Sequence, residues 1–115
     1  MKKQLRMYVL VPYNISEIQQ GIQAAHGIVE YGLKYPEGLY KEWATTHKVI
    51  IIYNGGTTGP KSTMMMHKKH LDRLHVKTAV FCEEDLNDAM TAIAFVLDMD
   101  KDSHIVGYLK QMRLA

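Results

Sequence analysis

The strongest constraint on the fold is a short apolar run near the start of the chain, residues 7–11, with the sequence Met-Tyr-Val-Leu-Val. A continuous apolar run of this length is typical of a strand that is buried on both faces in the middle of a sheet. Pro12 follows it and cannot donate a ladder hydrogen bond, so the strand should end there. The run therefore predicts a central, buried strand.

A helical pattern follows this strand. Ser16 and Gln19 have the spacing of a capping box, and Asn14 with Glu17 is an equally acceptable cap, so two starting points for the helix stay open. Apolar residues then recur at helical spacing to about Tyr35. This recurrence predicts a stripe that faces the core and consists of Ile18, Ile22, Ala25, Val29 and Leu33.

The rest of the chain adds further strands and helices. Pro36 predicts the start of a second helix, and residues 48–53, Lys-Val-Ile-Ile-Ile-Tyr, predict a second strand. A third helix is expected over residues 64–75 and a third strand over residues 76–81. Residues 91–97 fit either a helix or a buried strand, and we favour the strand.

The resulting order, β-α-α-β-α-β-β, predicts an α/β protein with three layers, in which a mixed four-stranded sheet carries helices on both faces. The 115 residues, of which 47% are hydrophobic, suffice for one domain with one core, so a single domain over residues 1–115 is expected.

Composition excludes several classes of protein. The net charge of +2 is too small for a dedicated duplex-DNA binder, so nucleic-acid binding would need a local basic patch. The single Cys82 excludes an internal disulfide framework and a metal site built from several cysteines. His67 and His70 lie one helical turn apart, but no His-Glu-x-x-His pattern exists, so we expect no metal and no cofactor. No apolar run is long enough for a membrane span, which favours a cytoplasmic protein.

Three stretches of the chain resemble the archaeal and eukaryotic type of peptidyl-tRNA hydrolase. They are Gln23-Ala24-Ala25-His26-Gly27, then Trp43 followed by Lys48-Val49-Ile50-Ile51, and near the end Val106-Gly107-Tyr108-Leu109-Lys110. The resemblance implies the fold of that family and hydrolysis of the ester that joins a peptide to tRNA. Small proteins with this pattern also occur in bacteriophage genomes, which suggests a phage origin and a location in the host cytoplasm.

The chain also departs from the family pattern. Gln19 stands where the family has a lysine, and Glu83-Glu84-Asp85 replaces its Asp-Ala-Gly turn. The match between Thr91 and the threonine or serine near the family's last strand is only vague. Because the lysine is absent, the resemblance carries over the fold more safely than the reaction.

Ester hydrolysis needs a group that activates water and a group that stabilises the oxyanion. The resemblance places His26, Gln23, and Glu83 or Asp85 in the catalytic site, with His26 as a base near neutral pH. This hypothesis requires the first helix and the acidic turn to meet at one end of the sheet.

A basic segment could hold phosphates of tRNA or of a small nucleotide. We predict that its phosphate-binding residues are Lys61, Lys68, Lys69 and Arg73. Two alternatives remain open. The chain could be a non-catalytic or divergent phage protein that binds or degrades a nucleotide signal of host defence, or a homodimeric interaction module that uses exposed methionines.

Overall fold

The computed structural model describes residues 4–58 and 62–115. Its centre is β1, Leu5–Pro12, which is the buried strand that the apolar run predicts. β1 pairs in parallel with β2, Ile50–Gly56, and in antiparallel fashion with β4, Ala89–Asp98. β4 pairs in turn with β3, Ala79–Glu83, so the strand order is β2-β1-β4-β3. The predicted mixed four-stranded sheet is therefore confirmed.

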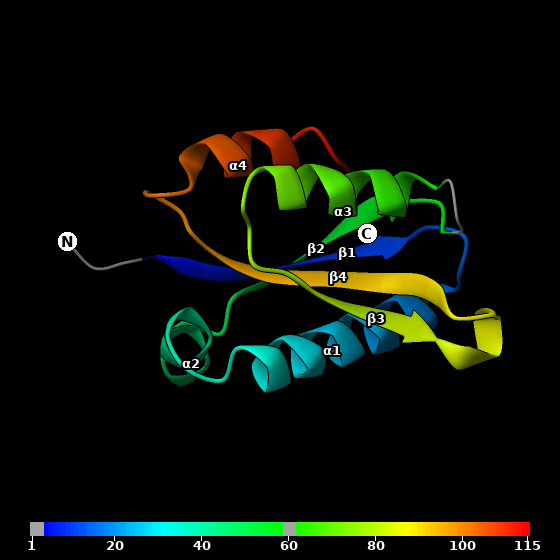
Figure 1. Cartoon of the computed structure of the whole chain (residues 1–115), viewed down its shortest axis with the longest axis horizontal. Coiled ribbons are helices and arrows are strands. Elements are labelled where there is room, and N and C mark those ends of the chain that lie inside the picture. Colours follow the sequence, from blue (N-terminus) through cyan, green and yellow to red (C-terminus); the bar gives the residue numbers. More distant parts are fainter. Residues whose placement is uncertain (1–3, 59–61) are drawn as a thin grey trace.

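Helices cover both faces of this sheet (Figure 1). α1, Glu17–Lys34, and α2, Leu39–Thr45, lie on one face, and α3, Thr63–Arg73, and α4, Ser103–Leu109, lie on the other. A short 3₁₀ helix, η1, Glu84–Leu86, joins β3 to β4. The three-layer α/β class is confirmed. Within the described residues, no helix combines the length and the apolar character needed to cross a membrane.

The carboxyl ends of three strands meet at one edge of the sheet. β1 and β2 are parallel, and β1 and β3 are both antiparallel to β4, so β1, β2 and β3 run in the same direction. α1 begins at this edge after the turn that follows β1, and the side chain of Ser16 caps it by accepting from the backbone N–H of Gln19 at 3.2 Å. In open α/β sheets, ligands bind preferentially beyond the carboxyl ends of the strands.

The predicted core stripe of α1 is wrong, because the helix turns that stripe to solvent. Ile18 is 77% exposed and Leu33 is 73% exposed, and Ile22, Ala25 and Val29 are exposed as well. The residues of α1 that are buried against the sheet are instead Gln23, Ala24, Gly27 and Tyr31.

Close packing explains this choice of face. A Cβ atom built at Gly27 would stand 2.9 Å from the Cβ of Ala92 and 3.5 Å from the Cβ of Ala94. Small residues on both the helix and β4 let α1 approach the sheet closely, whereas large aliphatic side chains would hold it away. Periodicity shows that an apolar stripe exists, but it does not show that the opposite face packs better.

The structure also differs from the prediction at several element boundaries and after residue 97. α2 begins at Leu39 rather than at Pro36, after Gly38 with a φ of 65°, which favours glycine. β2 continues to Gly56 through residues expected to form a turn. No element is predicted after residue 97, but α4 forms there and buries Ile105, Val106 and Leu109. The favoured strand over residues 91–97 is confirmed as part of β4, and all seven residues are buried.

Candidate functional site

A hydrogen-bonded network joins α1, β3 and β4 at the edge where the strands end. The side-chain amide of Gln23, which is 2% exposed, donates through Nε2 to Oε2 of Glu83 at 2.8 Å and to Oε1 of Gln19 at 3.4 Å. Its Oε1 accepts from Oγ1 of Thr91 at 2.6 Å, and Thr91 is fully buried. Every hydrogen-bonding function of this amide is therefore engaged, which fixes the amide in place.

A pocket of about 360 Å³ opens beside this network. Its lining includes Gln19, Gln23, Glu83 and Asp85, together with Ile15, Ser16 and Leu86. Three of the four residues predicted to be catalytic thus lie around one pocket. Glu83 is half-buried and Asp85 is exposed, so both carboxylates remain within reach of a ligand.

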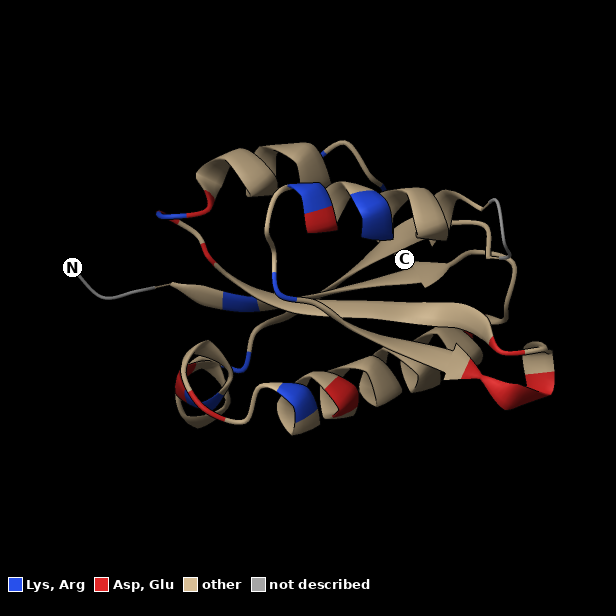
Figure 2. Cartoon of the chain, in the orientation of Figure 1, with Lys and Arg blue, Asp and Glu red and all other residues tan. Residues whose placement is uncertain are grey.

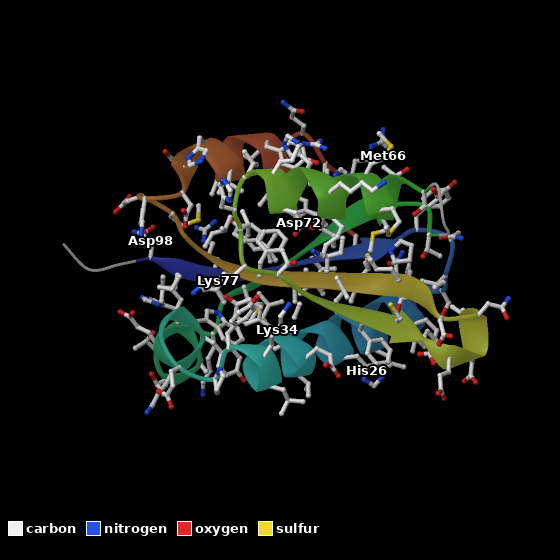
Figure 3. The ribbon with its side chains drawn as sticks, in the orientation of Figure 1. His26, Lys34, Met66, Asp72, Lys77 and Asp98 are labelled. Carbon is white, nitrogen blue, oxygen red and sulfur yellow. The ribbon has the colours of Figure 1, made fainter. Side chains whose placement is uncertain are left out.

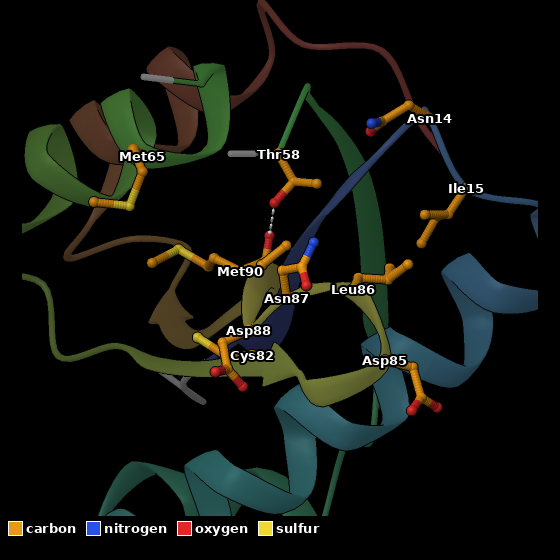
Figure 4. A pocket seen from close by; sticks show the side chains of 11 residues that line it. Asn14, Ile15, Thr58, Met65, Cys82, Asp85, Leu86, Asn87, Asp88 and Met90 are labelled. Atoms are coloured by element: carbon orange, nitrogen blue, oxygen red, sulfur yellow. Dashed lines mark hydrogen bonds between the residues drawn. The ribbon is translucent and has the colours of Figure 1, made fainter. Parts of the chain in front are cut away.

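A larger pocket of about 690 Å³ adjoins the first and shares Ile15, Asp85 and Leu86 with it (Figure 4). The carboxyl ends of the three parallel strands contribute to its wall through Asn14, Thr58 and Cys82. Thr58 donates through Oγ1 to the carbonyl oxygen of Met90 at 2.5 Å, which joins the segment after β2 to β4 (Figure 4). The two pockets together form a ligand-sized depression at the edge expected for this fold.

The rim of this depression is acidic. Figure 2 shows acidic residues along the end of β3 and η1, and Glu83, Glu84, Asp85 and Asp88 supply them. The turn into β4 holds Asn87 and Asp88 at φ angles of 55° and 58°, a left-handed conformation that Asn and Asp tolerate better than most residues. Of the described residues that line either pocket, none is Lys, Arg or His.

Cys82 lines the larger pocket, but it is a poor nucleophile. Burial and then the negative charge of Asp88 raise the pKa of its thiol above the ordinary value. Since the thiolate is the reactive form, a raised pKa keeps the side chain unreactive near neutral pH.

His26 does not line either pocket. Its ring stacks on that of Phe81 with the ring centroids 4.5 Å apart and the planes inclined by 19°. The side chain is exposed on the outer side of α1 and β3 (Figure 3). His26 follows Gln23 by one helical turn and is displaced from it by only about 60° around the helix axis, but its ring stacks on Phe81, whereas the amide of Gln23 is bonded to Glu83 and Thr91.

The residues predicted to bind phosphate lie in another layer of the molecule. Lys68, Lys69 and Arg73 belong to α3, across the sheet from α1 (Figures 1 and 2). Lys68 forms an ion pair of 2.5 Å with Asp72, and Lys69 and Arg73 are exposed. Lys61 lies outside the described residues. α3 nevertheless borders the larger pocket through Met65, and Lys69 follows Met65 by one helical turn on the same side of the helix.

His67 of the same helix is directed inward. Its Nδ1 forms a hydrogen bond with the hydroxyl of Tyr108 on α4, and the ring of His70 lies 4.3 Å from that of Tyr108. Burial and then the charge of His70 lower the pKa of His67 below the ordinary value of 6.5. His67 therefore contributes to the packing of α3 on α4 and not to a phosphate-binding surface.

The lowered pKa of His67 predicts a loss of stability in mild acid. The unfolded chain takes up a proton at this histidine near pH 6.5, whereas the folded chain does so only at lower pH, so the free energy of unfolding should fall as the pH drops below about 6.5. Urea unfolding at pH 7.5 and pH 5.5 measures this loss. His67→Gln should reduce the difference between the two pH values, and an unchanged difference would contradict the assignment.

Thr91 takes part in the network although the sequence alone does not place it in the site. It begins a run of otherwise apolar residues, Ala92 to Leu97, and a buried hydroxyl in such a place needs a hydrogen-bond partner. That requirement signals a polar contact with another element, but it does not identify the partner as Gln23.

Comparison with protein-family models gives no match for this chain, and comparison with curated proteins gives none either. The resemblance to peptidyl-tRNA hydrolases therefore rests on the three sequence stretches described above.

Proposed function

We propose that this protein hydrolyses an ester in an RNA-linked or nucleotide ligand, by its resemblance the ester of peptidyl-tRNA, with Glu83 as the group that activates water. One observation carries the proposal. The carboxylate of Glu83 stands at the wall of a pocket and is held there at 2.8 Å by the amide of Gln23, which is itself fixed by Thr91. A carboxylate that is positioned in this way can accept a proton from a water molecule that attacks the ester carbonyl.

The side chain of Gln19 suits the second requirement of the reaction. It lines the same pocket, and its Oε1 already accepts from Gln23, so its NH₂ group is the part left to donate to a ligand. A donor in this position can stabilise the oxyanion that forms when water attacks. Gln19 offers a hydrogen bond without the positive charge of the family lysine, so we expect slow turnover.

Phosphates of the ligand would lie toward α3. The acidic rim repels phosphate groups, so they cannot share the smaller pocket with the ester. Lys69 lies one turn beyond the pocket residue Met65 on the same side of α3, so its ammonium group is the one placed to meet a phosphate of a ligand that crosses the larger pocket, whereas Lys68 is paired with Asp72. In this arrangement the ester lies against Glu83 and the phosphates lie along α3.

A turnover assay with a model peptidyl-tRNA tests the proposal. The native chain should release free peptide, and Glu83→Gln should lower the rate by at least about a hundredfold, because an amide cannot accept the proton. Glu84→Gln is the matched control, since Glu84 is exposed and does not line either pocket. His26→Gln should keep most of the activity. No turnover by the native chain, or equal rates for Glu83→Gln and Glu84→Gln, would reject the assignment.

A second candidate is a protein that binds a nucleotide without cleaving it. It is favoured by the lack of a cationic side chain to stabilise the oxyanion, since none of the described residues that line the two pockets is Lys, Arg or His. Calorimetric titration with nucleotides, combined with analysis of the mixture for products, separates the two candidates. Binding that leaves the nucleotide intact supports this candidate.

A further inference from the structure

The outward face of α1 carries an apolar stripe that nothing within the described chain covers. Ile18, Ile22, Val29 and Leu33 expose 77%, 42%, 58% and 73% of their surfaces. They are large aliphatic side chains on the side of the helix that faces away from the sheet. Surface helices usually place charged and polar residues there, so this helix is amphipathic in the opposite sense.

Asp, Glu, Lys and Arg are absent from the central part of the helix. The twelve residues from Ile18 to Val29 include no Asp, Glu, Lys or Arg, although 23% of the whole chain is charged. Figure 2 likewise shows the middle of α1 without basic or acidic residues. Depletion of charge at the centre of an apolar patch is characteristic of protein interfaces. The lack of Lys and Arg also disfavours an anionic membrane surface or nucleic acid as the partner.

The spacing of the stripe matches a second copy of the same helix. Ile18, Ile22, Ala25 and Val29 follow one another at intervals of four, three and four residues, which is the spacing of a helix-pairing seam. The small Ala25 stands at its middle, with one large pair on each side. In an antiparallel pair related by a two-fold axis near Ala25, Ile22 of each copy therefore faces Val29 of the other.

We propose that two copies of this chain associate through an antiparallel pairing of their α1 helices. The pairing covers the exposed aliphatic side chains without burying a charge, and it sets the two helix dipoles in opposite directions, which is favourable. This inference does not depend on the proposed hydrolysis.

The dimer should be weak. A helix of 18 residues presents a face about 27 Å long and about 10 Å wide, whereas a standard stable interface buries roughly 800 Å² per partner. We therefore expect association on the order of 10–100 µM. Sedimentation velocity of the native chain over a concentration series should show the mass rising from one chain to two.

Charged substitutions locate the interface. Val29→Glu should weaken association by about tenfold or more, because it places an unpaired carboxylate against Ile22 of the other copy. Met66→Glu is the matched control: Met66 is 66% exposed, but it lies on α3 in the opposite layer (Figure 3). It should leave the dissociation constant unchanged. A native chain that stays monomeric throughout, or equal effects of the two substitutions, would overturn the proposal.

A double variant tests the direction of the pairing. Ile22→Lys and Val29→Glu should each dissociate the dimer, and together they should restore association at least in part. In an antiparallel pair, position 22 faces position 29 of the other copy, so the two introduced charges attract each other. In a parallel pair, like charges would face each other and the double variant would stay monomeric, which would overturn the antiparallel arrangement. Because both positions are exposed, each variant should remain folded, and circular dichroism and urea unfolding check this.

Discussion

Gly27→Leu is expected to lower the free energy of unfolding by about 3 kcal/mol. Gly27 is the point where α1 lies closest to the sheet. A Cβ atom at this position would meet the Cβ of Ala92 at 2.9 Å and Cγ1 of Val9 at 3.6 Å. A methyl group of alanine is fixed to its backbone and cannot turn aside, so a leucine side chain would have to push the helix away from β4. Urea unfolding at pH 7.5 measures the loss.

Gly21→Ala supplies the matched control for Gly27. A Cβ atom at Gly21 meets nothing within 4 Å, and the residue belongs to the same helix. Alanine should therefore stabilise the protein by about 0.5–1 kcal/mol through its higher helix propensity. Should Gly27→Leu prove as harmless as Gly21→Ala, the close packing of α1 on β4 would be wrong.

Gln23→Glu is expected to destabilise the protein by about 3 kcal/mol at pH 7.5 and to have little effect at pH 4. The substitution keeps the shape of the side chain but places a second carboxylate where the Gln23 amide now donates to Glu83 at 2.8 Å. Position 23 is 2% exposed, so water cannot screen the repulsion.

The direction of this pH dependence follows from proton binding. Repulsion and burial raise the pKa of the introduced carboxyl in the folded chain above its unfolded value of about 4.3. The folded chain then binds more protons between the two values, so stability falls as the pH rises above about 4.3. Below that pH the introduced group is protonated in both states and the penalty disappears.

Denaturant unfolding of the native chain and of Gln23→Glu at pH 4 and pH 7.5 measures the effect. Gln19→Glu is the control, because it adds the same charge at an exposed position one turn earlier and should change stability by less than about 0.5 kcal/mol. A penalty of equal size at both pH values would mean that packing, and not charge, governs position 23.

Substitutions at Glu83 and at Gln23 should also differ in whether they change turnover or stability. Glu83 is half-buried and faces a pocket, so its loss should change turnover more than stability. Gln23 is buried and its amide is hydrogen-bonded to Glu83 and Thr91, so its loss should lower stability. Turnover should then fall indirectly, because Glu83 is displaced. Gln23 is therefore a positioning residue, and Glu83 is the residue proposed to touch the ligand.

The candidate site was only partly predictable. Gln23, Glu83 and Asp85 do lie around one pocket, but His26 stacks on Phe81 outside it, and the basic residues of α3 lie across the sheet. Helical spacing places Gln23 and His26 on neighbouring parts of one face of α1, but only the packing of α1 on the sheet decides that Gln23 is buried at the network while His26 stacks on Phe81 outside the pocket. Thr91 gains its role only because α1 packs on β4 and brings Oε1 of Gln23 within 2.6 Å of the Thr91 hydroxyl.

The sequence by itself determined the order of elements as far as β4 and the strand at the centre of the sheet. β1 is apolar over residues 7–11 and β4 over residues 92–97, and only a sheet that is covered on both faces buries such runs. It limited the start of α1 to two capping positions, and the cap that forms is Ser16, which accepts from the backbone N–H of Gln19 through a purely local contact. Only the tertiary structure decided which side of α1 meets the sheet. That choice depends on the fit between Gly27 and the small residues of β4, and such a fit depends on distances between segments that are far apart in the chain.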